Sequence, residues 1–465
     1  MRFLFLRNFL ESFSKFDILS SELQKKGHIC DVLFTSEYAR EQSRAKVNQY
    51  SNVYVYKRSK KLINLDHSNY KDFDSLEKVC LIPVIDRITH LNLDYSIENA
   101  KVDFKYVYCF LHSHFSQNSY DAVIFEQETD VFSLLARNFS EIFGFKYITF
   151  AIGASMINGY TEIYTQSWWE VGSSIPNFSS NNKQKNKGKE IYNTLLDRVL
   201  YKENPNSAYQ DQTTRSIRIN FFMALLELML KWPLLYIQKL SLTKNDYDPF
   251  HGSLILWNIR CRLTKLYRSI RWPIYSIIFQ RRSEIPKENY FILPLQFRPE
   301  ASTSVIGSKY LDEIKLIDNI LSHTPTESKL IVKDHPQAAG FRSLYFYFRL
   351  LFRSRVITVL EHGDLSKLIK RSSGVFFNTS KFGLEASLLN NNVFCLGSPV
   401  YSSFPGIHNI HDIENTGSIL RKRKPKINSE LSEDRVEWLS KYSNIIVEDD
   451  NLKSQVNRII SLASE

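Results

Sequence analysis

The sequence predicts an α/β protein with two parallel-sheet domains and a helical region between them. Three observations carry this prediction. Short apolar runs of strand length alternate with segments of helical spacing in both halves of the chain, as in successive β-α units. At 465 residues the chain is longer than one ordinary domain. Between the two α/β regions the sequence turns polar and then becomes rich in aromatic and basic residues.

The first domain is expected over residues 1–171. It begins with a strand over 2–6, a helix over 11–26 that stops at Gly27, and a strand over 31–35. Glycine tolerates the left-handed backbone that commonly ends a helix, so its position supports this β-α-β unit. The pattern continues with strands over 53–56, 122–125 and 147–150, and with an amphipathic helix over 131–143 that is closed by Gly144.

Residues 172–287 are expected to separate the two domains. Up to residue 204 the segment contains runs such as SSNNKQKNKGK, which bury little apolar surface and predict a mobile surface loop or linker. Two stretches follow, 213–242 and 253–280, in which helical spacing combines Arg and Lys with Trp, Tyr and Phe. Such faces are typical of helices on an anionic membrane surface, and packing between the domains is the alternative.

The second domain is expected over residues 288–430 and C-terminal helices over 431–465. Four strand-length runs in this domain end in polar residues, and they read FILPLQFRPEASTS, LIVKDHPQ, VFFNTSKFGLEA and VFCLG. Ligands of open parallel sheets bind at the carboxyl ends of the strands. The polar residues that follow these runs are therefore the candidate binding residues.

The net charge of +11 and the pI near 9.1 favour anionic partners, namely nucleic acid, phospholipid head groups or phosphorylated and acidic substrates. Nucleic acid is disfavoured because no nucleic-acid-binding motif is present. The five scattered cysteines suggest neither a disulfide framework nor a zinc site, which fits a reducing cytoplasm. His112 and His114 lack a third ligand, so no metal site is expected. We expect no signal peptide and no transmembrane span.

The VFFNTSKFGLEA block predicts an anion site. A strand that ends near Phe377 passes through Asn378, Thr379 and Ser380 into a helix, where hydroxyls and free backbone N–H groups favour a phosphate. Glu385 lies about one turn inside that helix and can accept hydrogen bonds from ribose hydroxyls. The alternative is a helix cap with a carboxylate that compensates the helix dipole.

Two further blocks place polar side chains after strands. Lys333 and His335 can donate to a phosphate, and Pro336 fixes the turn behind them. In the other block, Gln296, Arg298 and Glu300 follow the run FILPL, and an ordinary polar turn is the alternative.

Together these blocks resemble the capsule polysaccharide synthesis family, whose members have the GT-B glycosyltransferase architecture of two Rossmann-like domains facing a cleft. The resemblance covers Gln296-Phe-Arg-Pro299-Glu300, Lys333-Asp-His335-Pro336, Ser380 to Glu385, and Gly397-Ser-Pro399, in the order of the family's motifs. The turn at Asn378 departs from the Gly/Thr-rich turn common in the family. The HP and Ser/Thr blocks also look like those of bacterial sialyltransferases and Kdo transferases, which makes a CMP-sugar one candidate donor.

The resemblance implies a nucleotide-sugar donor in the second domain, an acceptor at the first domain, and no metal or other cofactor. The implied donor-binding residues are Gln296, Arg298, Glu300, Lys333, His335, Pro336, Asn378, Thr379, Ser380, Gly383 and Glu385. The resemblance places His335 near the phosphate, as a candidate catalytic residue. Glu126 and Glu128 are chosen by position, because they lie between a strand and a helix of the first domain where an acceptor would lie, and each is a candidate base or nucleophile. Asp130, next to them, is expected to cap a helix.

The resulting expectation is a cytoplasmic glycosyltransferase, peripheral on the inner membrane, that acts in capsule or O-antigen biosynthesis. Its acceptor would be a glycan or a lipid-linked oligosaccharide, and its membrane partner an anionic inner-membrane surface. A nucleotide-sugar 2-epimerase, or a glycerophospho- or phosphoribosyl-transferase, is the alternative on the same fold. A polysaccharide-binding or assembly protein is the non-enzymatic alternative.

Overall fold

The computed structural model describes residues 1–8, 14–42, 49–58, 73–91, 95–125, 130–151, 159–200, 289–297, 307–335, 342–359, 365–390, 392–410 and 430–465, with residue 338 and single positions between 247 and 287. Of these, residues 1–167, 247–253 and 445–465 form one compact unit, called unit 1. Residues 168–200 and 263–444 form the second, called unit 2. The expected basic aromatic helices between 213 and 280 lie almost entirely outside the described residues.

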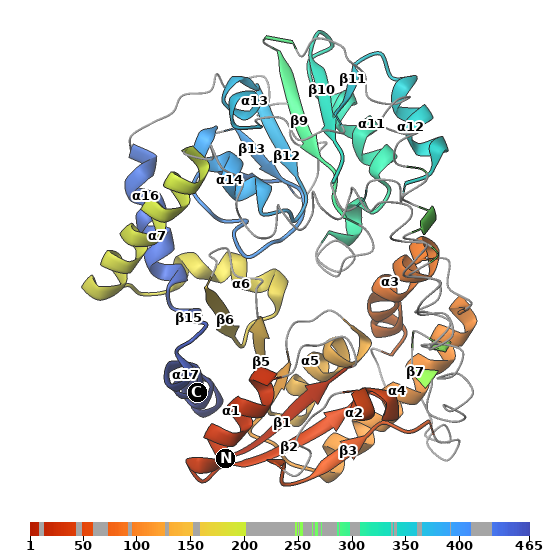
Figure 1. Cartoon of the computed structure of the whole chain (residues 1–465), viewed down its shortest axis with the longest axis vertical. Coiled ribbons are helices and arrows are strands. Elements are labelled where there is room, and N and C mark those ends of the chain that lie inside the picture. The colour runs from red at the N-terminus through yellow and green to blue at the C-terminus, as the bar shows by residue number, and fades with distance from the viewer. Residues whose placement is uncertain are drawn as a thin grey trace. The chain divides into compact units, whose positions relative to one another are not determined.

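Unit 1 is built on a seven-stranded sheet with the order β15-β6-β5-β4-β1-β2-β3 (Figure 1). Its strands are β1 (Arg2–Arg7), β2 (Ile29–Phe34), β3 (Val53–Val55), β4 (Ala122–Phe125), β5 (Lys146–Ala151), β6 (Tyr160–Tyr164) and β15 (Ile446–Glu448). Strands β1 to β5 are parallel, whereas β6 and β15 pair antiparallel. The strand order reverses between β1 and β4, as in a Rossmann fold.

Unit 1 contains the two helices predicted for the first domain and, between them, helices that were not predicted. Those described are α1 (Ser14–Lys25), α2 (Glu37–Gln42), α3 (Phe73–Leu91), α4 (Ile97–Gln117), α5 (Val131–Phe143) and α17 (Leu452–Ser464). Asp130 caps α5 in a capping box with Ser133, and Gly144 ends that helix with a φ of 76°, so both end predictions are confirmed. His112 and His114 lie on helix α4.

The His114 imidazole makes unit 1 sensitive to acid. The side chain is buried against Tyr120, whose hydroxyl lies 3.0 Å from His114 Nε2. Burial, and then the charge of Arg2, lower the pKa of His114 to about 4. The unfolded chain therefore binds more protons than the folded chain between this value and the ordinary histidine pKa of about 6.5, and stability falls as the pH drops through that window.

We expect the change His114→Gln to remove part of this acid sensitivity, because glutamine carries no titrating group. Between pH 7 and pH 4, wild type should lose on the order of 3 kcal/mol more unfolding free energy than the variant, as the pKa difference requires. Urea denaturation at the two pH values measures the difference. Equal losses in the two proteins would show that His114 is not the group responsible.

Unit 2 contains a six-stranded sheet with the order β11-β10-β9-β12-β13-β14, and all neighbouring strands are parallel. The strands are β9 (Tyr290–Pro294), β10 (Lys329–Lys333), β11 (Val356–Val359), β12 (Gly374–Phe377), β13 (Val393–Cys395) and β14 (Ile407–Asn409). The order again reverses next to the first strand, here between β9 and β12. Both units are thus Rossmann-like, and the predicted α/β fold class is confirmed.

Helices cover the unit 2 sheet, with α11 and α12 beside β9 to β11, and α13 and α14 beside β12 and β13 (Figure 1). These helices are α11 (Glu313–His323), α12 (Leu344–Leu351), α13 (Leu365–Arg371) and α14 (Phe382–Leu389). Apolar side chains from β9, β10, β12 and α11 form one core, which includes Phe291, Ile317, Val332 and Phe376. No described helix is long and apolar enough to cross a membrane.

The loop prediction for residues 172–204 is wrong, because the segment contains α6 (Trp168–Ser174) and the long helix α7 (Asn182–Leu200). Helix α7 packs on α16 (Glu430–Tyr442) through a buried stripe at helical spacing. The stripe consists of Gly188, Ile191, Leu195 and Val199. A Cβ at Gly188 would lie 2.2 Å from Ser440 Oγ, so glycine permits the close helix contact. The many Lys and Asn residues on the exposed side of α7 gave the segment the composition of a polar loop, so its helical stripe was not recognised in the sequence.

The C-terminal segment contributes to both units. Helix α16 belongs to unit 2, while β15 extends the unit 1 sheet and α17 packs on α1 and β5. The two expected helices are therefore present, with an unpredicted strand between them.

Candidate functional site

The carboxyl ends of β9 and β12 meet where the strand order of unit 2 reverses. Gln296 follows β9, Thr379 follows β12, and Gln296 Nε2 donates a hydrogen bond of 2.8 Å to Thr379 Oγ1. The structure thus brings together two predicted donor-binding residues that are far apart in the sequence. Ligands of doubly wound α/β sheets bind at this reversal point.

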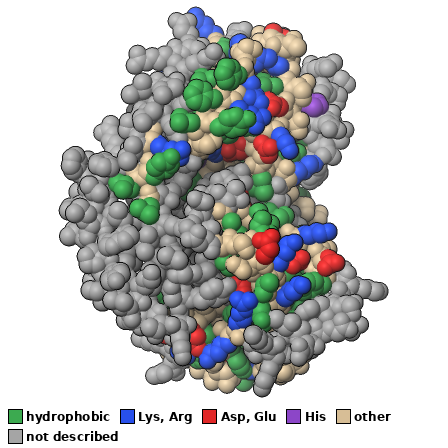
Figure 2. Space-filling model, turned by 90° about the vertical axis from the view of Figure 1, so that its right-hand side faces the viewer, with side chains coloured by type: hydrophobic (Ala, Val, Ile, Leu, Met, Phe, Trp, Pro, Cys, Tyr) green, Lys and Arg blue, Asp and Glu red, His purple; other side chains and the backbone are tan. Residues whose placement is uncertain are grey.

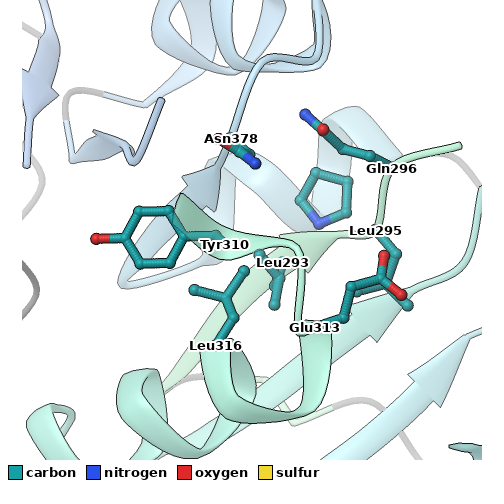
Figure 3. A pocket seen from close by; sticks show the side chains of 8 residues that line it. Leu293, Leu295, Gln296, Tyr310, Glu313, Leu316 and Asn378 are labelled. Atoms are coloured by element: carbon teal, nitrogen blue, oxygen red, sulfur yellow. The ribbon is translucent and has the colours of Figure 1, made fainter. Parts of the chain in front are cut away.

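A shallow, open pocket lies beside this bridge, and its cavity volume is about 10 Å³, room for about one water molecule. Figure 3 shows the amides of Gln296 and Asn378 along one edge and the α11 side chains Glu313 and Leu316 along the opposite edge. The remaining lining residues are Leu293, Pro294, Leu295 and Tyr310. The pocket therefore has an apolar floor with a few polar groups at its rim.

Asn378 is wedged between two loops of unit 2. Its Nδ2 donates to the carbonyl oxygen of Gly307 at 3.1 Å. A Cβ at Gly307 would lie 2.2 Å from Asn378 Nδ2, and a Cβ at Gly397 would lie 2.5 Å from Asn378 Oδ1. Both glycines therefore allow the amide to sit between them, and Gly397 of the predicted Gly-Ser-Pro element has this packing role.

Asp334, of the Lys-Asp-His-Pro motif, is buried and fixes the end of β10 through its hydrogen bonds. Its carboxylate accepts hydrogen bonds from the His335 backbone N–H at 2.7 Å, from the Arg342 guanidinium and from the Tyr347 hydroxyl. Burial, and then the negative charge of Asp334, raise the pKa of Tyr347, so its hydroxyl stays protonated and donates. The backbone at His335 is thereby held in one position.

Arg342 links Asp334 to the loop that follows β9. Its guanidinium donates to Glu313 at 2.6 and 2.9 Å and to the carbonyl oxygen of Gln296 at 2.6 Å, besides its bond to Asp334. Burial alone would lower the pKa of Arg342, but the charges of Asp334 and Glu313 raise it. One buried cation therefore positions the backbone at two predicted donor-binding residues.

Sequence reasoning missed Arg342, Glu313 and Tyr347 because none belongs to a motif. The available signal was Asp334, whose carboxylate between Lys333 and His335 needed a cationic partner if buried. Nothing in the spacing identified which arginine that partner would be.

Lys333 and His335 stand at the end of β10, next to β9. Lys333 is buried, and its backbone carbonyl accepts from the Leu295 N–H at 2.8 Å. The His335 ring lies 5.9 Å from the Phe297 ring, centroid to centroid. The two predicted phosphate ligands are thus on the strand adjacent to the Gln296 loop.

The loop before α14 is held by two hydrogen bonds and by close packing. Ser380 Oγ accepts a hydrogen bond of 3.3 Å from the Phe382 N–H, and the Tyr401 hydroxyl donates to the carbonyl oxygen of Thr379 at 2.9 Å. A Cβ at Gly383 would lie 2.4 Å from the Phe377 ring, so glycine lets the helix approach the strand. Lys381 is the N-cap of α14 and makes no side-chain cap hydrogen bond, so both the phosphate role of Ser380 and its capping alternative stay predictions.

Glu385 is half-buried and pairs with Arg198 of α7, at 3.4 Å between Arg198 Nη2 and Glu385 Oε1. The ion pair keeps the carboxylate at the surface between α14 and α7. Contact with a ribose stays a prediction.

Several predicted site residues lie outside the described residues, namely Glu126, Glu128, Arg298, Glu300 and Pro336. Asp130, which follows the first two, accepts a hydrogen bond of 3.0 Å from Asn8 Nδ2. Within the described part of the chain, no three His, Cys, Asp or Glu side chains gather where they could hold a metal ion.

The motif region matches a known family. Residues 262–433 match the family model described as capsule polysaccharide biosynthesis protein, which confirms the resemblance seen in the strand-end blocks. No curated protein matches the chain by sequence.

Several solved structures are similar at low identity. A Kdo 2,7 transferase, KpsC of Thermosulfurimonas dismutans, is 12% identical over 76% of this chain and 88% of its own, with a TM-score of 0.33. The UDP-GlcNAc 2-epimerase of Methanocaldococcus jannaschii is 10% identical over 95% and 100%, with a TM-score of 0.29. The glycosyltransferase SnogD from Streptomyces nogalater is 10% identical over 100% and 99%, with a TM-score of 0.26. At TM-scores this low the likenesses carry no argument about chemistry.

Proposed function

We propose that the protein is a glycosyltransferase of bacterial capsule or O-antigen biosynthesis that takes its sugar from a nucleotide-activated donor. One observation carries the proposal: the bridge from Gln296 to Thr379 spans the reversal point of unit 2, inside the segment that matches the capsule family. A CMP-sugar is our preferred donor, and a glycan or lipid-linked oligosaccharide is the proposed acceptor.

In the proposed reaction the acceptor hydroxyl oxygen forms a bond to the anomeric carbon while the bond from that carbon to the donor phosphate breaks. Lys333, His335 and backbone N–H groups of the loop before α14 stabilise the negative charge that develops on the departing nucleotide. The Gln296 and Thr379 side chains hold the donor in place, which lowers the entropic part of the barrier. The acceptor's proton passes to a carboxylate, for which Glu126 and Glu128 are the candidates.

We further propose that this chemistry needs no metal ion or other cofactor, because cationic side chains and backbone donors take the role of neutralising the phosphate. The proposed location is the cytoplasmic surface of the inner membrane. The net charge of +11 supports an anionic partner there.

The test is an incubation of the full chain with CMP-, UDP- and GDP-sugars, with and without oligosaccharide acceptors, in the presence of EDTA. The proposal expects a glycan product together with one released nucleotide per transfer. An epimerised donor without glycan product would identify an epimerase instead. Absence of both nucleotide binding and turnover across the panel would contradict an enzymatic role.

A further inference from the structure

Helix α12 has two faces of opposite character. Tyr347 and Leu350 are buried in the core of unit 2. On the other side Leu344, Tyr345, Phe348 and Phe352 are exposed, and the exposed fractions of Tyr345 and Phe352 reach 69% and 86%. We call these four side chains the outer face of α12. Leu344, Phe348 and Phe352 are spaced four residues apart, so they form one stripe along the helix.

Single exposed apolar residues are ordinary, but a contiguous stripe of large ones marks a contact surface. Helix α12 lies at the edge of unit 2 that faces the viewer in Figure 2, where hydrophobic side chains gather with both basic and acidic side chains beside them.

Arginine side chains lie next to the outer face of α12. The Arg349 guanidinium lies 5.7 Å from the centre of the Tyr345 ring, on the same side of the helix. Arg353 pairs with Asp318, at 2.6 Å between Arg353 Nε and Asp318 Oδ1. Lys329 and Arg355 donate to backbone carbonyls of the adjoining turns. Aromatic side chains with arginine beside them suit the interface of an anionic membrane.

The same helix is tied to the candidate donor site. Tyr347, on its buried face, donates to Asp334, and Arg342, two residues before the helix begins, donates to the carbonyl oxygen of Gln296. Binding of a partner to the outer face would therefore place the carboxyl ends of β9 and β10 near that partner.

We propose that the outer face of α12 inserts into the interface of an anionic lipid membrane. The inference names the membrane partner of the proposed function, and its test needs no transferase activity, so the two can fail separately. A protein partner is less suitable, because a stable protein interface buries roughly 800 Å² per partner. Helix α12 has eight residues and is only about 12 Å long and 10 Å across, so its surface is too small for such an interface. Binding to a membrane requires only that the side chains of the outer face insert among the lipids.

The test is flotation of the full chain with vesicles of phosphatidylcholine alone and of phosphatidylcholine with phosphatidylglycerol. We expect binding to the anionic vesicles and a loss of about tenfold or more in the partition coefficient for the double change Phe348→Ser and Phe352→Ser. The change Arg349→Gln should weaken binding to anionic vesicles a few-fold, because about one favourable charge contact is lost. The control is Ile142→Ser, which removes an exposed apolar side chain from α5 and should leave binding unchanged.

Unchanged vesicle binding in the double variant, or absence of binding by wild type, would overturn the proposal. A second measurement is sedimentation velocity without lipid. If wild type associates with itself and the double variant does not, the outer face is a contact between copies and the membrane assignment is wrong. Melting curves of the variants must match wild type, which is expected because the changed side chains are exposed.

Discussion

The change Arg342→Met is expected to lower the unfolding free energy of unit 2 by about 3–5 kcal/mol, the cost of leaving a buried ion pair without one partner. Asp334 and Glu313 both direct carboxylate oxygens at this guanidinium, and both are largely shielded from water. Methionine fills a similar volume but provides no donor. The Gln296 carbonyl also loses a hydrogen bond of 2.6 Å. Urea denaturation of the full chain measures the change.

The matched control for this prediction is Arg353→Met. Arg353 also pairs with an aspartate, but the Asp318 side chain is 47% exposed, so water can replace the arginine. The expected cost is about 0–1 kcal/mol, as for other surface ion pairs. Similar losses in the two variants would show that the Arg342 network is an ordinary surface pair and does not hold the site together.

The second large effect is expected for His335→Ala, which should lower kcat by about 10²–10³, as does the removal of one donor to a developing negative charge. Affinity for the donor should fall much less, because the charge on the phosphate grows mainly as the sugar departs. The fold should be unaffected, since Asp334 holds the backbone at His335 through its N–H and not through the imidazole. Steady-state rates and donor titration separate the two quantities.

His323→Ala is the control for this variant, because His323 hydrogen bonds only to neighbours at the end of α11 among the contacts described for it. Its rate should equal that of wild type. An unchanged kcat and an unchanged donor affinity in His335→Ala would remove His335 from the site.

Local features of the fold could be predicted because they depend on neighbouring residues. The strands that end at Pro294, Lys333 and Phe377 follow from their apolar runs, and the Asp130 cap follows from one side chain and the N–H groups next to it. Helix α7 was not predicted because exposed polar residues dominate its composition. Its apolar stripe is buried only by packing on α16, which lies more than two hundred residues later in the chain.

The candidate site could be predicted only in part, for a related reason. Motifs identified Gln296 and Thr379 separately, but their contact depends on β9 lying between β10 and β12, which follows from the sheet order. Arg342 stands in no motif, and its role depends on Glu313 and Asp334, which only the fold brings together. Strand order and long-range pairing are not readable from local spacing.

The most direct test of the central claim, that the reversal point of unit 2 binds a nucleotide, is thermal unfolding with CMP, UDP and GDP. A ligand that binds only the folded chain stabilises it by about 2.7 kcal/mol at a hundred times its Kd, so one nucleotide should raise the melting temperature of wild type by several degrees. The change Thr379→Val, which removes the hydroxyl bonded to Gln296, should abolish most of that increase, and Thr326→Val, at an exposed turn, should retain it. A nucleotide-induced increase that persists undiminished in Thr379→Val, or no increase with any nucleotide, would contradict the account.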